Sequence, residues 1–280
     1  MGGLLFGTAG TPVSSEGNDS LSGIRKVKEL GLGCMELEFV RGVKMGERTA
    51  QRVNEAAGQL GVKLSVHAPY YINLNSEGET LARSKERIMN SARIGNICGA
   101  KNVVIHAGFC QGGSKQVVYG KIKKELIDTG ERLKSENINT TLRIETMGQK
   151  SRFGSLEDVL DITEVEGVLP CIDFSHLHAR TGKLNSHEEF AWILKRVEER
   201  LGREGLDNMH IHVSGIEYSD KGEKRHLTFA ESDFKYRELA QVLSDFGVRG
   251  RVISESPNLE VDALALKKEY ENFISSQPFR

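Results

Sequence analysis

Six stretches of the sequence pair a short β-rich run with a histidine or an acidic residue near its carboxyl end. They are SVHA (65–68), VIHAG (104–108), RIET (143–146), CIDFSH (171–176), MHIHVS (209–214) and ISES (253–256). A lone histidine in such a run is most often a hydrogen-bonded core residue, and a buried carboxylate is costly unless it is paired or binds a metal. Six runs that all end in this way indicate a metal site instead.

The types of these residues narrow the choice of metal. Imidazole and carboxylate ligands without cysteine favour zinc, manganese or iron, whereas magnesium prefers oxygen ligands alone. A carboxylate such as Glu145, between the histidine runs and the further acidic runs, is placed to bridge two ions. Two ions about 3.5–4 Å apart suit phosphodiester hydrolysis. A single ion flanked by carboxylates suits aldose–ketose isomerisation, and the spacing leaves both open.

The side chains meet only if the fold brings the ends of these runs together. The chain alternates β-rich runs with amphipathic helical stretches, which predicts eight strand–helix units. Strands are predicted at Leu4–Thr8, Met35–Phe39, Leu64–Ala68, Val103–Ala107, Leu142–Thr146, Pro170–Phe174, Met209–Val213 and Val252–Ser256. Helices are predicted around residues 18–31, 46–60, 79–99, 115–137, 155–166, 186–204, 233–247 and 260–275. The number of units favours an α/β fold of the (β/α)8 TIM-barrel type, whose chemistry lies at the carboxyl ends of the strands.

Composition excludes several other classes of protein. The 280 residues carry 38 basic and 39 acidic side chains, so there is no global basic field of the kind that non-specific nucleic-acid binders show. The four cysteines are far apart, which argues against a zinc knuckle or a disulfide scaffold. No run is apolar enough to span a membrane, and the first residues do not resemble a secretion signal. We expect one domain over residues 1–280, a cytoplasmic location and no membrane partner.

Several segments resemble the endonuclease IV family of abasic-site DNA nucleases, within the xylose-isomerase-like barrel superfamily. They are SVHAPYYINL (65–74), VIHAGF (104–109), RIETMGQKSRFGSLEDVLDI (143–162), CIDFSHLHAR (171–180), MHIHVSG (209–215), KRHL (224–227) and ESPNLEVDALALKK (255–268). They run through most of the chain in the order found in the family, and the chain looks closest to its compact, archaeal-type members.

The resemblance implies a cluster of up to three zinc ions, with manganese as the alternative metal. The implied ligands are His67, His106 and Glu145 for the first ion, Glu145, Asp173, His212 and Glu255 for the second, and His176 and His226 for the third. Family members have a further ligand for the third ion, an Asp two residues before its last histidine. Lys224 stands at that position here. Either Glu223 or His178 replaces the missing ligand, or the protein binds two ions; whether His210 is also a ligand stays open.

The resemblance also implies the reaction, which is hydrolysis of the phosphodiester 5′ to an abasic site in double-stranded DNA by a monomer. Glu145 and Glu255 are the implied catalytic residues; Glu255 orients the attacking water or accepts its proton. Tyr70 and Tyr71 follow the His67 run, where family members insert side chains into the minor groove, an insertion that offsets the cost of unstacking bases. Arg41 is a candidate contact to the DNA backbone.

Two other functions fit parts of the pattern. A sugar isomerase or epimerase would use one metal held by Glu145, Asp173, His212 and Glu255, with Glu36 or Glu38 in the same site. His67 and His106, which supply a further metal position, favour the nuclease. A non-catalytic sensor of DNA damage would keep the fold and the binding loops but need not keep the ligands, and nearly all of the ligands are present.

Overall fold

The strands of the computed structural model, which describes residues 3–276, close into a parallel barrel. The barrel strands are β1 Leu4–Ala9, β2 Cys34–Glu38, β3 Lys63–His67, β4 Asn102–Ile105, β5 Thr141–Glu145, β6 Val168–Asp173, β7 Met209–Val213 and β10 Gly250–Ser254. Their order around the barrel is β1-β10-β7-β6-β5-β4-β3-β2, so each strand lies beside its neighbours in the sequence and β10 closes on β1. The predicted (β/α)8 barrel is confirmed.

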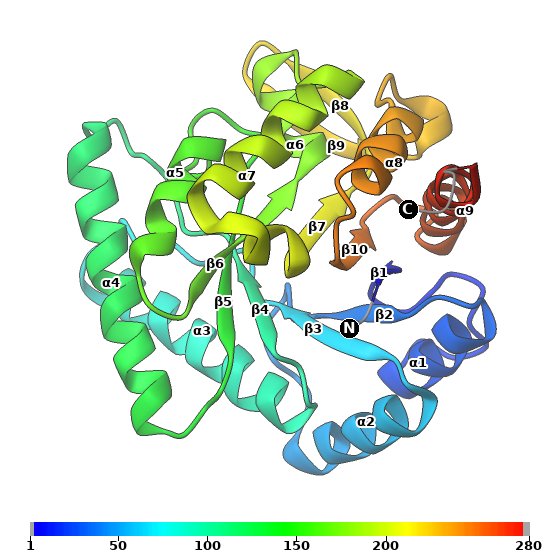
Figure 1. The fold of residues 1–280 in the computed structure, drawn as a ribbon. Helices are drawn as coiled ribbons and strands as arrows, with labels where there is room; N and C mark the ends of the chain where they lie inside the picture. The colour runs from blue at the N-terminus through cyan, green and yellow to red at the C-terminus, as the bar shows by residue number, and fades with distance from the viewer. Residues whose placement is uncertain (1–2, 277–280) are drawn as a thin grey trace.

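Helices surround the barrel (Figure 1). They are α1 Ser20–Glu29, α2 Glu47–Leu60, α3 Gly78–Ile97, α4 Lys115–Ser135, α5 Leu156–Asp161, α6 Phe174–Thr181, α7 His187–Asp207, α8 Tyr236–Asp245 and α9 Glu260–Ser276, with single 3-10 turns at Ile162–Glu164 and Phe229–Glu231. All except α6 fall within or close to a predicted range. A capping box begins α5, because Ser155 and Asp158 each accept a hydrogen bond from the other's backbone N–H. None of the helices described over residues 3–276 is long and apolar enough to cross a membrane.

The two faces of each barrel strand carry different kinds of side chain. Apolar residues such as Val66, Ile144 and Ile211 belong to the hydrophobic core that packs strands against helices. The alternate residues point into the barrel, and many of them are polar. His210 of β7 contacts Glu36 of β2 at 2.9 Å, although these strands are not neighbours, so the contact crosses the barrel interior. Buried ionisable groups are therefore found inside the barrel as well as at the carboxyl ends of its strands.

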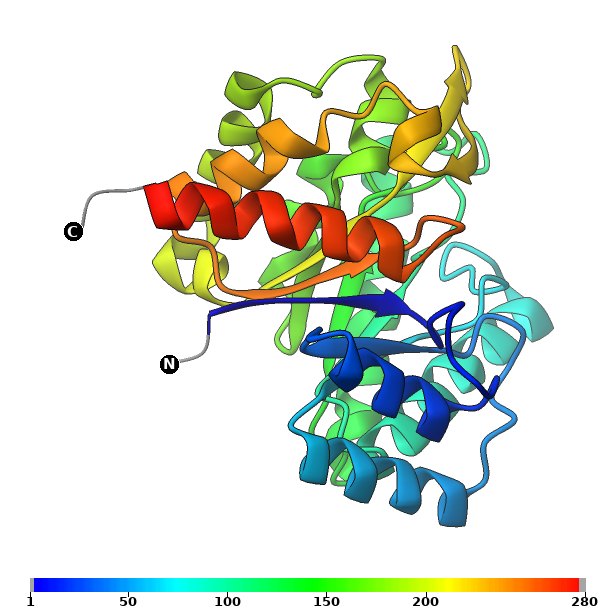
Figure 2. The ribbon, with the colours of Figure 1, turned by 90° about the vertical axis from the view of Figure 1, so that its right-hand side faces the viewer.

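A β-hairpin that the sequence did not predict follows β7. Its strands are β8 Gly215–Ser219 and β9 Gly222–Leu227, which pair in antiparallel orientation. In the side view it stands at the same end of the barrel as the arrowheads of the strands (Figure 2). Gly222 has a positive φ of 98°, and a Cβ atom there would lie 2.1 Å from the carbonyl oxygen of Gly148. Glycine at this position lets the hairpin lie directly against the loop after β5.

Candidate metal centre

All eight predicted ligands lie at the carboxyl end of the barrel strands. They come from the end of β3 (His67), the residue after β4 (His106), the end of β5 (Glu145), the end of β6 (Asp173), α6 (His176), β7 (His212), β9 (His226) and the residue after β10 (Glu255). The structure thus brings together side chains that are up to 188 positions apart in the chain. Together with Glu223, their ligand atoms form three groups, in each of which all atoms lie within 4.8 Å of one another, and two of these groups share Glu145.

The first group contains His67, His106 and Glu145. The Nε2 atoms of the two histidines lie 3.2 Å and 2.9 Å from the same oxygen, Oε2 of Glu145. All three side chains are buried. Two imidazole nitrogens and a carboxylate oxygen at one point match the three-ligand pattern of a catalytic zinc site.

The second group contains Glu145, Asp173, His212 and Glu255. Oε1 of Glu145, the oxygen not used by the first group, lies 3.8 Å from Nδ1 of His212, which is also 3.4 Å from Glu255. Asp173 is the N-cap of α6, and its Oδ1 accepts the backbone N–H of His176, which leaves Oδ2 as the oxygen not used for capping. The two oxygens of Glu145 therefore point to two neighbouring groups, as a bridging carboxylate requires.

The third group contains His176 and His226, as expected, with Glu223 as its carboxylate. Glu223 Oε2 lies 3.4 Å from Nε2 of His176, and Oε1 lies 3.8 Å from Nε2 of His226. Gly148 leaves the room for this side chain, since a Cβ atom at position 148 would lie 2.5 Å from the Cβ of Glu223. Of the two replacements considered for the missing aspartate, the geometry favours Glu223.

His178 is not part of this group, because both of its nitrogens have other partners. Nδ1 contacts the carbonyl oxygen of Lys183 at 2.8 Å, and Nε2 contacts Asp233 at 3.1 Å.

A β-bulge in the hairpin explains why Glu223 can take this place. The register of β8 and β9 pairs Glu217 with Arg225 but Tyr218 with Glu223, so Lys224 is the extra residue of the bulge. Lys224 is 52% exposed and forms an ion pair with Glu217, as does Arg225. The bulge thus turns Lys224 to the surface and directs Glu223 to the histidines.

Contacts of Nδ1 with backbone carbonyls orient the other ring nitrogen of several histidines, Nε2, toward the three ligand groups. Three histidines have Nδ1 next to a backbone carbonyl: His67 with Ala68 at 2.7 Å, His176 with Thr146 at 3.0 Å and His226 with Glu255 at 3.2 Å. An Nδ1–H that donates to a carbonyl leaves Nε2 as the ligand atom, which is the usual arrangement around protein-bound zinc.

Unpartnered buried atoms provide a test of whether an ion fits. Oε1 of Glu145, Oδ2 of Asp173 and Nδ1 of His212 are buried and make no hydrogen bond. Buried polar atoms normally have partners, and several in one place indicate a missing cation. The residues present therefore fit bound metal ions, and their nitrogen and oxygen ligands suit zinc or manganese.

Proton release should accompany metal binding at the first group. Burial opposes protonation of His67, but the hydrogen bond to Glu145 and the charges of Glu38, Glu145 and Glu36 raise the pKa of His67 to about 10. His67 is therefore protonated at neutral pH in the metal-free protein and must lose that proton to bind an ion. We expect the apparent zinc Kd to increase about tenfold for each unit that the pH falls from 8 to 6. Competition with a chromophoric chelator measures this, and a Kd independent of pH would contradict it.

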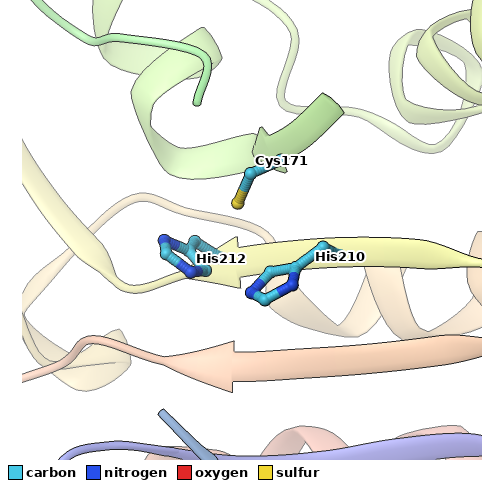
Figure 3. Close-up of side chains that lie close together, drawn as sticks. All are labelled: Cys171, His210 and His212. Atoms are coloured by element: carbon cyan, nitrogen blue, oxygen red, sulfur yellow. The ribbon is translucent and has the colours of Figure 1, made fainter. Parts of the chain in front are cut away.

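A second layer of buried side chains lies next to His212, with His210 on the same strand toward its amino end (Figure 3). His210 and His212 project from the same face of β7, and Cys171 of β6 points toward them. Glu36 joins both histidines: its Oε2 lies 2.9 Å from Nε2 of His210 and its Oε1 lies 2.8 Å from Nε2 of His212. Burial raises the pKa of the Cys171 thiol to about 12, so the thiol is protonated beside these histidines in the metal-free protein. We interpret this layer as a support that holds Nδ1 of His212 toward Glu145 and Glu255.

Replacing Glu36 with glutamine tests this interpretation. An amide accepts only one of the two imidazole N–H groups, so His212 loses part of its orientation. Loss of a carboxylate behind a metal-bound histidine typically lowers metal affinity by about 10- to 100-fold. We expect that loss in a zinc titration of Glu36→Gln. The matched control is Glu125→Gln, a buried carboxylate on α4 that is paired with Lys85 away from the site; equal zinc affinity of the two variants would contradict the interpretation.

Tyr70, Tyr71 and Arg41, the predicted DNA contacts, lie on the rim of this end of the barrel. Tyr70 is 45% exposed, and its ring stacks on that of His106 with 5.3 Å between centroids. Tyr71 is 67% exposed. The backbone N–H of Tyr70 donates to the carbonyl oxygen of Val40, so the loop with the exposed Arg41 runs beside the tyrosines. The loop after β2 and the loop after β3 therefore lie side by side at this rim.

A cavity of about 210 Å³ opens over the ligands. Besides predicted ligands and Tyr70, it is lined by three residues of the loop after β5, which are Met147, Gln149 and Arg152. Sequence reasoning did not single out these three, because a loop residue has no periodic pattern to reveal where it points. Glu38, at the end of β2, is buried with Oε1 unpartnered, and burial together with the charges of Glu36 and Glu255 raises its pKa to about 8 despite the opposing effect of His67. It belongs to none of the metal groups found among the described residues.

Comparison with known proteins places this geometry in a family. The sequence profile of the xylose isomerase-like TIM barrel family matches residues 24–274. The chain is 45% identical over 269 residues to an uncharacterised protein of Methanocaldococcus jannaschii, a match that covers 95% of this chain and 97% of that protein. It is 30% identical over 158 residues to a protein of Streptomyces coelicolor described as "Probable endonuclease 4", which covers 52% of this chain and only 53% of that protein.

Solved structures share the fold at lower identity. Endonuclease IV from Thermus thermophilus superposes with a TM-score of 0.73 and 16% identity, over 96% of this chain and 100% of that chain. A D-tagatose 3-epimerase-like protein gives a TM-score of 0.68 at 21% identity, over 91% of this chain and 96% of that chain. The same barrel therefore occurs in a nuclease and in an epimerase-like protein, so the choice between these activities depends on the ligands.

Proposed function

Because the chain belongs to the xylose isomerase-like TIM barrel family, we propose that it is a metal-dependent DNA repair endonuclease. Its substrate is double-stranded DNA with abasic sites, and it hydrolyses the phosphodiester 5′ to the lesion. The observation that carries this proposal is the sharing of Glu145 between two ligand groups, with a third group beside them. Such an arrangement has positions for two or three ions, whereas a one-metal sugar isomerase needs only the group of Glu145, Asp173, His212 and Glu255.

The proposed ligands are the eight predicted residues together with Glu223. Zinc ions bound there would lower the pKa of water and neutralise the charge that develops on the phosphate oxygens. Glu255 lines the cavity and lies 3.4 Å from His212, so its carboxylate is placed to orient the attacking water and accept its proton. The walls of the cavity hold the scissile phosphate next to this base.

The rim supplies the contacts to the duplex. Tyr70 and Tyr71 present two exposed aromatic rings beside the cavity, and aromatic side chains inserted into the minor groove offset the cost of unstacking bases. Arg41 lies on the adjoining loop and would contact the DNA backbone. Because the net charge of the chain is only −1, duplex binding would come from this local surface and from the bound cations. We propose that the protein acts as a monomer, since all of these residues come from one chain.

A nicking assay tests the proposal. The substrate is a duplex with one synthetic abasic site, incubated with zinc-loaded protein in the presence and absence of a strong chelator, and an unmodified duplex is the control. Cleavage only of the abasic duplex, and only without the chelator, is expected. No cleavage by protein with full metal occupancy would refute the nuclease. Binding to abasic DNA without cleavage would identify a damage sensor.

One observation favours a second candidate, an epimerase or isomerase of a sugar. The four ligands that such an enzyme needs form one of the three groups, and a D-tagatose 3-epimerase-like protein shares the fold. Incubation of the metal-loaded protein with ketohexoses, followed by chromatography of the products, separates the candidates. Turnover of a sugar together with inactivity on abasic DNA would establish the epimerase.

A further inference from the structure

Arg152 differs from two other buried or half-buried arginines, Arg143 and Arg180. Arg143 donates to Asn102, to Asn208 and to the carbonyl oxygen of Pro170. Arg180 donates to carbonyl oxygens of the loop after β5, those of Met147, Gln149 and Arg152. Both arginines have structural partners for their guanidinium groups.

The guanidinium of Arg152 has few and weak partners. Its Nε donates to Oε1 of Gln149 at 3.3 Å, and one Nη lies 3.4 Å from Nδ1 of His106. Within the described residues 3–276 no carboxylate oxygen lies within ion-pair distance of it. A guanidinium has five N–H donors, so most of the donors of Arg152 are left for a ligand.

The position of this cation is fixed by its neighbours. The plane of Phe109 lies beneath it, with the central carbon of the guanidinium 4.5 Å from the ring centroid. Residues Phe109 and Arg152 also form an isolated antiparallel bridge, and Arg180 holds the carbonyl oxygen of Arg152. The side chain is thus held on the cavity wall beside His106, while Tyr70 stacks on the same histidine.

The charges around the cavity indicate which ligand suits this position. Among the described residues that line the cavity, Arg152 is the one lysine or arginine, and the acidic residues are Glu145, Glu223 and Glu255. Burial lowers the pKa of Arg152 against the opposing charges of Glu223 and Glu145. A guanidinium that has lost part of its hydration gains most from an anion with several oxygens, and its fork of donors matches a phosphate.

We propose that Arg152, with Gln149 beside it, forms a phosphate subsite that binds a non-bridging oxygen of the scissile phosphodiester. This inference rests on the proposed function for the identity of the phosphodiester, whereas the affinity for a phosphate oxyanion belongs to Arg152 itself. Its role in the reaction is to hold the phosphate against the ligand cluster and to balance the negative charge that accumulates on it during attack.

The test replaces Arg152 with glutamine and measures binding of inorganic phosphate to the zinc-loaded protein by calorimetry. Loss of a charged hydrogen-bond donor from a half-buried site weakens an anion complex by roughly 10- to 100-fold. We expect that increase in the Kd for phosphate, an unchanged zinc content, and a similar decrease in kcat/KM on the abasic duplex. Arg152→Lys keeps the charge without the fork and should recover part of both losses.

The control is Arg237→Gln, which removes an arginine that stacks on an aromatic ring in the same way, at 5.6 Å over Tyr236, but on α8 outside the cavity. A phosphate Kd within twofold of the wild type in Arg152→Gln would overturn the subsite. Loss of zinc with no change in the phosphate Kd would overturn it too, because Arg152 would then only support His106. If the protein does not nick abasic DNA at all but the phosphate Kd still rises, the proposed nuclease fails while the subsite stands.

Discussion

Glutamine in place of Glu145 is expected to reduce nicking by at least about a thousandfold and to remove metal from two of the three ligand groups. Both oxygens of this carboxylate are used, Oε2 by His67 and His106 and Oε1 on the side of His176 and His212. An amide keeps the shape but not the charge or the second ligand oxygen. Losing several kcal/mol of charge stabilisation in the transition state corresponds to a loss of this size.

Metal analysis of the purified variant, together with single-turnover nicking, measures the effect. Circular dichroism shows whether the barrel stays folded, and Glu166→Gln is the matched control, an exposed carboxylate that pairs with Lys134 outside the site. Full metal content and normal nicking in Glu145→Gln would show that this residue is not the bridge between two ions.

The carboxylate of the third group gives the second large expected effect. Glu223→Gln should lower the zinc stoichiometry by one ion and slow nicking by roughly 100-fold, since one of the proposed cations would lose a ligand. Lys224→Asp should change neither quantity. Its side chain lies on the outer face of the hairpin with Glu217, so an aspartate there would not reach His176 and His226.

The two variants separate the two explanations of the altered motif. Both variants replace a residue of β9, at neighbouring positions. Each variant is therefore the other's control for a general disturbance of this strand. Zinc analysis by mass spectrometry of the native protein gives the stoichiometry directly. A gain of one ion in Lys224→Asp, with no loss in Glu223→Gln, would contradict the bulged register and restore the aspartate as the missing ligand.

Much of the fold and the proximity of most of the proposed ligands could be predicted from the sequence for one physical reason. In a parallel barrel every strand ends on the same side, so a histidine or carboxylate at the end of a recognisable β-rich run has a known location. His67, Glu145 and Asp173 each end such a run, and the structure brings them together. The apolar residues of the runs are β-branched or aliphatic, which made the strands themselves easy to recognise.

What could not be predicted depends on contacts between distant or irregular segments. The hairpin strands GIEYS and GEKRHL are short and charged, so no periodicity marks them. The proposed ligand role of Glu223 depends on a bulge that only the pairing of the two strands reveals. Glu36 and His210 are 174 positions apart and meet across the barrel interior. Arg152 lies in a loop whose course is set by Arg180 and Phe109 rather than by its own sequence pattern.

The most direct test of the account is whether the protein cleaves at an abasic site, and with which chemical ends. A duplex with one synthetic abasic site, labelled on the damaged strand, is treated with zinc-loaded wild-type protein, and the products are identified by mass spectrometry. The account predicts a 3′-hydroxyl on the upstream fragment and a 5′-deoxyribose phosphate on the downstream one, with no product after chelation and recovery when zinc is added back. Intact DNA despite full zinc occupancy, or cleavage that persists in the chelator, would contradict it.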